Sequence, residues 1–154
     1  MSLYLLALLI GVIAGLRAMT APAVVAWGAH LGFIPLQGTP LAWLGGGVAP
    51  WVFTVLAVLE LVSDQLPKTP SRKVPVQFGT RIVMGAFSGA AIGMTANAGI
   101  GGAVAGAIGA VIGTLGGADG RGRLAKAFGK DLPAGLIEDL VAVGGAILIV
   151  IATP

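Results

Sequence analysis

Five apolar stretches, separated by short segments rich in glycine, proline and charge, make up most of this chain and limit what it can fold into. They cover residues 3–33, 41–63, 82–96, 100–115 and 134–151. Only 10% of the 154 residues are charged, against roughly 25% in an ordinary soluble domain, so polar cover for a surface in water is missing. The pattern predicts an all-α, polytopic integral membrane protein with about five spans, in which residues 1–154 form a single membrane domain.

Arg17 and Pro22 interrupt the first apolar stretch. Residues 3–16 alone would rise about 21 Å as a helix, short of the roughly 30 Å hydrocarbon core of a bilayer. Thr20 is a candidate N-cap for a second helical piece, with Pro22 in its first turn. We therefore expect a break at residues 17–21. One kinked span is the first interpretation of this stretch, and a re-entrant pair of helices is the second.

Glycine recurs at every fourth position in the third and fourth stretches. The two series are Gly85, Gly89, Gly93 and Gly109, Gly113, Gly117. A stripe without side chains lets two helices approach until their backbones touch. We expect a helical hairpin that turns at residues 97–99 and packs as a glycine zipper, with the partner of each stripe either in the same chain or in a second subunit.

The basic residues gather in two connectors, at residues 64–81 and 116–133. An even number of expected spans lies between these connectors, so both should lie on one face, the cytoplasmic one by the positive-inside rule. Five spans then put the amino terminus in the cytoplasm and the carboxyl terminus outside, whereas a re-entrant pair in the first stretch would change this parity. A short interfacial helix is expected at residues 122–128. This arrangement favours the inner (cytoplasmic) membrane. Although the pI is about 9.8, we expect the lipid bilayer as a partner and no nucleic acid.

Six ionisable residues lie inside or against the apolar stretches. A charge at mid-membrane costs at least about 2.5 kcal/mol, so such residues usually face protein or water and often mark a pathway. Together with Thr20 at the expected helix start, they form our candidate ion- or substrate-binding set: Arg17, Glu60, Asp64, Arg81, Glu138 and Asp139.

Each acidic pair has two interpretations. Glu60 and Asp64 are four residues apart and share one helical face. They form either a cation or proton site or two solvated acids at a helix end. Glu138 and Asp139 lie near the start of the last stretch. Either they are acids that the helix dipole favours at this end, or they belong to a polar site.

Arg17 lies next to an expected helix start, whose free N–H groups favour anions. If the first stretch spans the membrane, Arg17 needs a carboxylate partner. The candidates are Glu60, Asp64, Glu138 and Asp139. A structural ion pair and a substrate or gating pair both remain open.

The sequence offers little for catalysis. It has no cysteine and one histidine, His30, which excludes thiolate and histidine-rich metal sites. No nucleophile-elbow, metalloprotease or dinucleotide-binding motif is present. We expect no enzyme activity and no cofactor, and the sequence does not identify a metal.

Residues 60–72, with the sequence Glu-Leu-Val-Ser-Asp-Gln-Leu-Pro-Lys-Thr-Pro-Ser-Arg, are followed by Arg-Ile-Val-Met-Gly-Ala at residues 81–86. These segments resemble the signature region of the uncharacterised bacterial multi-span membrane proteins of domain-of-unknown-function family 4126. Residues 15–18 and 131–139 are also similar, so the resemblance covers nearly the whole chain. It implies a multi-span membrane protein and supplies no activity.

Each half of the chain holds an apolar stretch, an arginine at a break, a small-residue helix and a span with paired acids. That order suggests an inverted internal repeat, as in transporters built around a midplane site. The leading hypothesis is a small membrane transporter or channel-like protein that forms a homodimer, because 15.2 kDa is little protein to enclose a pathway. Alternatives are a non-catalytic membrane scaffold and, more weakly, a metal-dependent enzyme acting on lipid headgroups with Glu60 and Asp64 as ligands.

Overall fold

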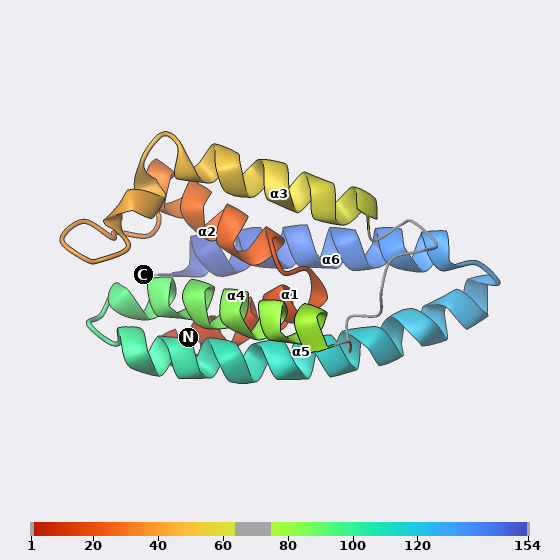
Figure 1. The fold of residues 1–154 in the computed structure, drawn as a ribbon. Helices are drawn as coiled ribbons and strands as arrows, with labels where there is room; N and C mark the ends of the chain where they lie inside the picture. The colour runs from red at the N-terminus through yellow and green to blue at the C-terminus, as the bar shows by residue number, and fades with distance from the viewer. Residues whose placement is uncertain (1, 64–74, 154) are drawn as a thin grey trace.

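The computed structural model describes residues 2–63 and 75–153, and this part of the chain is helical without any strand. The all-α prediction is therefore confirmed. The elements, shown in Figure 1, are α1 (Leu3–Leu16), α2 (Thr20–Leu31), the 3-10 helix η1 (Ala42–Gly45), α3 (Ala49–Ser63), α4 (Pro75–Met94), α5 (Gly99–Phe128) and α6 (Asp131–Ala152).

The chain reverses direction between α1 and α2. The ring of Tyr4 lies beside Gly101 at the start of α5, and Gly15 lies against residues 110–114 of the same helix. From the break onward, α2 runs along α6, from Arg17 beside Asp139 to Gly28 beside Val150. The first apolar stretch is thus an antiparallel helix pair, which corrects the interpretation of one kinked span (Figure 1).

The break lies where the sequence predicts it, although its cap differs. Arg17 has extended backbone angles, and Thr20 is the first residue of α2, after Met19 in the N-cap position. The hydroxyl of Thr20 makes no cap hydrogen bond, so our N-cap prediction is wrong. Pro22 does occupy the first turn, where its missing N–H is not needed.

α5 packs between α1 and α4 along its glycines. A Cβ on Gly89 would overlap the backbone of Gly102 and Gly106, and a Cβ on Gly106 would overlap the carbonyl group of Gly85. Gly93 likewise meets the backbone at Ala98 and Gly102. The α4 stripe therefore finds its partner inside the same chain.

The second glycine series meets α1. A Cβ on Gly109 would overlap the carbonyl group of Leu8, and a Cβ on Gly113 that of Val12. Gly117, one turn further along α5, is half-buried. Three helices therefore touch through their backbones around the first half of α5, which is the packing that small residues permit.

Several predicted boundaries are wrong. Residues 116–128, expected as a connector with a short separate helix, continue α5 without interruption. In this extension Arg123 and Asp119 form an exposed ion pair at 3.2 Å, four residues apart, which supports a helix. α4 begins at Pro75, inside the predicted polar connector, because proline suits a first helical turn.

The second apolar stretch is also divided. Residues 41–63 form η1 and α3, separated by Gly46 and Gly47. Consecutive glycines weaken a helix because they lose the most backbone freedom on folding. α3 is consequently only 15 residues long.

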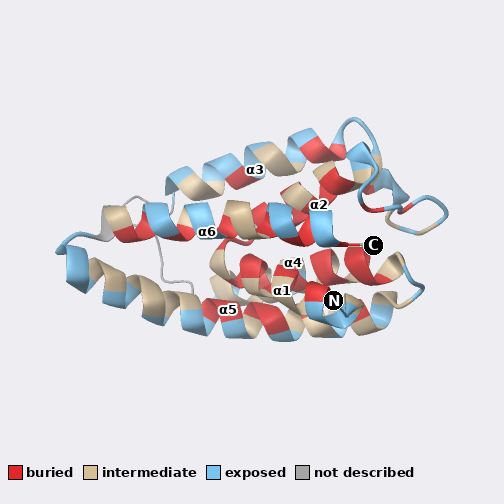
Figure 2. Cartoon of the chain, turned by 180° about the vertical axis from the view of Figure 1, so that it is seen from behind, coloured by how far each residue is buried: buried red, intermediate tan, exposed pale blue. Residues whose placement is uncertain are grey.

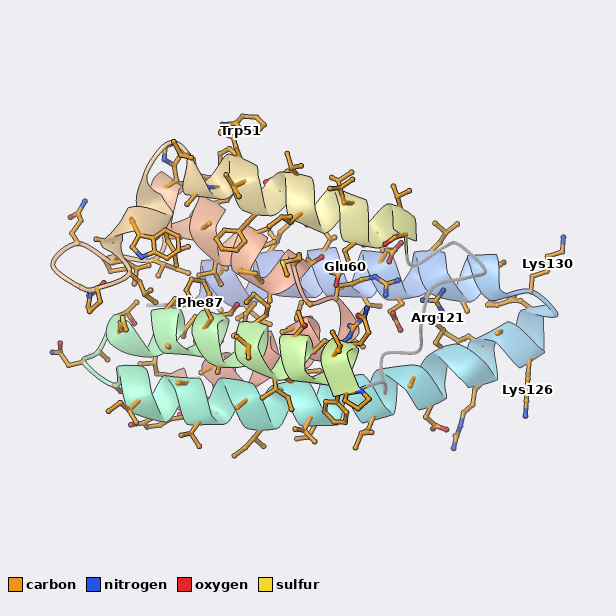
Figure 3. All side chains as sticks on the ribbon, in the orientation of Figure 1. Trp51, Glu60, Phe87, Arg121, Lys126 and Lys130 are labelled. Atoms are coloured by element: carbon orange, nitrogen blue, oxygen red, sulfur yellow. The ribbon has the colours of Figure 1, made fainter. Side chains whose placement is uncertain are left out.

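Both chain ends lie at the same end of the bundle, beside the α4–α5 turn (Figure 1). This is the arrangement expected for the second interpretation of the first stretch, because the reversal at Arg17 returns the chain to the end of the bundle where it began. Lys126 and Lys130 project from the opposite end, where α5 and α6 meet (Figure 3). Of the predicted basic connector at residues 64–81, the part 64–74 lies outside the described residues.

Many of the exposed residues on α3, α5 and α6, which are pale blue in Figure 2, carry aliphatic side chains. On α5 they recur about every fourth residue, and α3 and α6 expose such side chains along most of their length. The exposed residues of the α5 stripe are Ile100, Val104, Ile108, Ile112 and Leu115. Among the described residues, two helical segments, Gly99–Phe128 and Pro133–Ala152, are long and apolar enough to cross a membrane, while α1 and α3 are apolar but shorter.

Candidate functional site

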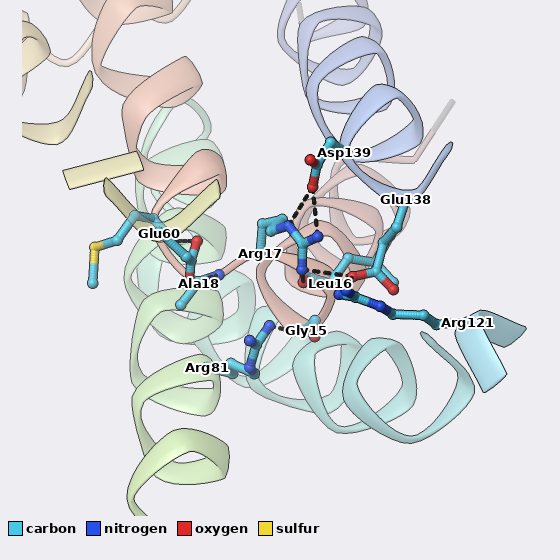
Figure 4. A network of polar contacts seen from close by, with 10 residues as sticks. Gly15, Leu16, Arg17, Ala18, Glu60, Arg81, Arg121, Glu138 and Asp139 are labelled. Carbon is cyan, nitrogen blue, oxygen red and sulfur yellow. Dashed lines mark hydrogen bonds and ion pairs between the residues drawn. The ribbon is translucent and has the colours of Figure 1, made fainter. Parts of the chain in front are cut away.

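Arg17, at the break between α1 and α2, is completely buried and lies against α6. Its Nε donates to Asp139 Oδ1 at 2.7 Å, and its Nη2 lies 2.5 Å from the same oxygen. Its Nη1 lies 2.6 Å from Glu138 Oε1 (Figure 4). One guanidinium therefore binds two neighbouring carboxylates of α6, as the need for an acidic partner suggested.

A second arginine joins this cluster from α5. Nη1 of Arg121 lies 3.7 Å from the Glu138 oxygen that also contacts Arg17. Figure 4 shows both guanidinium groups directed at this carboxylate. Arg121 falls in the predicted basic connector at residues 116–133 and was not among the candidate site residues. Only the extension of α5, which sequence patterns did not indicate, brings it beside α6.

Glu60, on α3, binds the backbone of the break. Its Oε2 accepts a hydrogen bond from the N–H of Ala18, and its Oε1 accepts one from the N–H of Met19, both at 2.9 Å. The carboxylate thus satisfies two amides just before α2 begins. An anion is favoured at this position because the amino end of a helix carries partial positive charge.

Arg81, on α4, binds the other side of the break. It is buried, and its Nη1 donates to the carbonyl oxygen of Gly15 at 2.9 Å. Nη1 of Arg17 donates to the carbonyl oxygen of Leu16 at 3.2 Å. Both carbonyls belong to the last turn of α1, where cations are favoured by the helix dipole.

The break is therefore held by charge on both sides. Arginines satisfy the carbonyl end of α1, and a glutamate satisfies the amide groups that precede α2. Four other elements, α3 to α6, supply the remaining side chains of this cluster (Figure 4). We call Arg17, Glu60, Arg81, Arg121, Glu138 and Asp139 the break cluster.

Of the predicted site residues, the structure brings together Arg17, Glu60, Arg81, Glu138 and Asp139. Thr20 follows the amides that Glu60 binds, and its hydroxyl is buried without a hydrogen-bond partner among the described residues. Asp64 lies outside the described residues, so its predicted pairing with Glu60 is not placed.

Two kinds of group could not be predicted from the sequence. The first is the set of backbone amides and carbonyls of the break that bind charged side chains. The second is the hydroxyls of Ser88 and Thr114, which are completely buried and lack hydrogen-bond partners among the described residues. A lone Ser or Thr within a glycine-rich helix gives no signal beyond small size.

His30 lies away from the break cluster, in the last turn of α2, with Nδ1 3.0 Å from the carbonyl oxygen of Gly45. Within the described ranges, no group of three His, Cys, Asp or Glu side chains is arranged to hold a metal ion. The cluster as it stands binds hydrogen-bonding and charged groups of the chain itself.

No protein-family model, curated protein sequence or solved structure matches this chain.

Proposed function

We propose that this chain is a multi-pass membrane protein whose helices are surrounded by lipid. The supporting observation is the exposure of aliphatic side chains along α3, α5 and α6. Apolar patches of this extent are rare on soluble monomers. The 20-residue segment Pro133–Ala152 rises about 30 Å, which matches the hydrocarbon core.

The α1–α2 pair is then a re-entrant hairpin. α1 has 14 residues and rises only about 21 Å. The break at Arg17 therefore lies inside the hydrocarbon region, or at the edge of this region nearest the end of the bundle that carries Lys126 and Lys130. Irregular backbone at such depth occurs only where protein buries it or where it lines a water-filled cavity. The break cluster supplies that burial.

We propose further that the protein is a small transporter or channel-like protein for an ion or small solute, with the break cluster as its polar site. The observation that carries this proposal is the convergence of ionisable side chains from α3, α4, α5 and α6 on one helix break. Transporters place broken helices at their sites because the free helix ends bind charged groups. The predicted homodimer and inverted repeat remain parts of this proposal.

A second candidate, a non-catalytic membrane scaffold, is favoured by the internal pairing of the cluster. Arg17 contacts two carboxylates, and Glu60 has both oxygens bound. A network of this kind also serves merely to hold helices together. The resemblance to family 4126 is compatible with either function.

Solute flux in proteoliposomes separates the two candidates. Arg17→Gln removes the central cation, and Arg123→Gln is the matched control because the Arg123 side chain is 81% exposed and pairs with Asp119 on its own helix. A transporter predicts flux for the wild type and the control, and loss of at least about tenfold for Arg17→Gln at equal amounts of folded protein. Absence of flux for every ion and small solute tested in the wild type would favour the scaffold.

A further inference from the structure

The end of the bundle where α5 meets α6 carries an excess of positive charge. Residues 116–133 hold four Lys or Arg and two Asp, which leaves a net charge of +2. Lys126 and Lys130 are exposed, and they project from opposite sides of this end, across the direction of the helices (Figure 3). We call residues 119–130 the α5–α6 tip. Exposed cations therefore flank the tip on two sides.

The tip belongs at the level of the lipid headgroups when the helices cross a membrane. The Arg123 side chain, which pairs with Asp119 on the same helix, is 81% exposed. Charged side chains are strongly disfavoured in hydrocarbon, so long basic side chains near helix ends extend to the headgroup layer. Because Lys126 and Lys130 project sideways from the bundle, their ammonium groups point towards the headgroups of neighbouring lipids.

Apolar side chains are exposed among these charges. Phe128, the last residue of α5, is 52% exposed, and Leu136, in the second turn of α6, is 55% exposed. Aromatic and aliphatic side chains next to Lys and Arg are typical of surfaces at the boundary between headgroups and acyl chains. A partner dissolved in water would match the charge alone, whereas lipid matches both the lysines and the apolar side chains.

The net charge of the tip selects among lipids. A zwitterionic headgroup carries its own cation beside the phosphate, which partly cancels the attraction to lysine. An anionic headgroup has no such cation and keeps a net negative charge. Each Lys or Arg close to an anionic membrane surface favours binding by about fivefold. Two lysines on opposite sides of the tip should therefore enrich anionic lipids around it.

We propose that the α5–α6 tip is a docking surface for anionic phospholipids of the surrounding membrane. Lys126 and Lys130 bind headgroup phosphates on the two sides of the tip, and Phe128 lies at the acyl-chain boundary. This inference rests on the proposed membrane function and adds the class of lipid that the protein prefers. Lipid contact and lipid preference are separate measurements, so the two proposals fail separately.

The test uses single cysteines, because the chain has none of its own. Ala127→Cys places a fluorophore at an exposed position of the tip, and Ser2→Cys places it at the opposite end of the bundle (Figure 1). The labelled protein is reconstituted in phosphatidylcholine vesicles that contain a small fraction of nitroxide-labelled phosphatidylglycerol or nitroxide-labelled phosphatidylcholine. The nitroxide quenches on contact, so the ratio of the two quenching constants measures the local enrichment of the anionic lipid.

Phosphatidylglycerol should quench the tip fluorophore about threefold more than phosphatidylcholine at low salt. The ratio should be about one for Ser2→Cys. Sodium chloride at about 0.5 M should lower the ratio at the tip towards one, because the Debye length is then only about 4 Å. Equal quenching by both lipids at the tip, or a ratio as large at Ser2→Cys, would overturn the proposal.

Charge variants assign the preference to the two lysines. Lys126→Gln with Lys130→Gln, in the Ala127→Cys chain, should lower the ratio to below about 1.5. Lys68→Gln with Lys73→Gln makes the same charge change outside the described residues and should leave the ratio near threefold. A ratio that the first pair leaves unchanged, or that the second pair lowers as much, would also overturn the proposal. Absence of quenching by either lipid at both labelled positions would instead overturn the proposed membrane function on which it rests.

Discussion

Arg17 and Asp139 are 122 positions apart in the sequence, yet Nε and Nη2 of the arginine both contact one carboxylate oxygen of the aspartate. This contact joins the break between α1 and α2 to the first half of α6. It places the most buried charge of the described chain at the point where the first helix pair turns.

The Arg17 contacts should dominate the stability of this region. Arg17→Gln leaves Glu138 and Asp139 buried without their central cation, and removing one partner of a buried ion pair typically costs about 3–5 kcal/mol. We expect a large fall in Tm in detergent, with Arg123→Gln close to the wild type because an exposed pair contributes about 0–1 kcal/mol. Similar Tm values for both variants would contradict a structural role for Arg17.

Gly106 should tolerate no side chain. A Cβ there would overlap the carbonyl group of Gly85 and approach Gly89, so Gly106→Ala must separate α5 from α4. Overpacking of this kind costs about 1–3 kcal/mol. Gly116→Ala, on the same helix with open space around it, should be neutral or slightly stabilising, since alanine favours a helix by up to about 1 kcal/mol. Thermal unfolding of the two variants gives the comparison.

The orientation in the membrane can be mapped by single cysteines, because the chain has none of its own. Ser2→Cys and Lys126→Cys lie at opposite ends of the bundle (Figures 1 and 3). With the basic end cytoplasmic, a membrane-impermeant maleimide should label Ser2→Cys in intact spheroplasts and Lys126→Cys only after lysis. Labelling of both from one side would refute the arrangement of the helices in the bilayer.

The Trp27–Thr54 hydrogen bond should anchor the first half of α3. Thr54→Val keeps the side-chain shape but removes the acceptor for the indole N–H at 2.7 Å. Loss of one such bond costs about 1 kcal/mol, more if the donor stays buried. We expect a modest fall in Tm. Thr80→Val is the control and should change Tm less, because the exposed hydroxyl of Thr80 donates to the backbone of its own helix.

Much of this fold could be predicted from local patterns. The all-helical class follows from the apolar stretches, the break from Arg17 and Pro22, and the α4–α5 turn from residues 97–99, where Asn97 has a positive φ in the structure. The direction of the chain after the break could not be predicted. It depends on Glu60, Glu138 and Asp139 binding the break from other helices, and single-residue spacing carries no information on such long-range contacts.

Most residues of the candidate site were predicted, but the contacts that they make were not. Burial cost alone singles out charged residues in apolar stretches, which is why Arg17, Glu138 and Asp139 stood out. No sequence pattern indicated that Glu60 binds the amides of Ala18 and Met19. Arg121 was not singled out, because a glycine-rich, charged segment is typical of a loop. In the structure α5 continues through this segment and packs beside α6.

Because α1 starts and α6 finishes at the same end of the bundle, a short flexible peptide can join two copies of the chain in tandem without reversing either. Each copy would insert in the same sense, and each half of such a fusion could carry its own substitution. A concatemer with one intact and one altered break would then reveal whether two subunits work independently or as a unit.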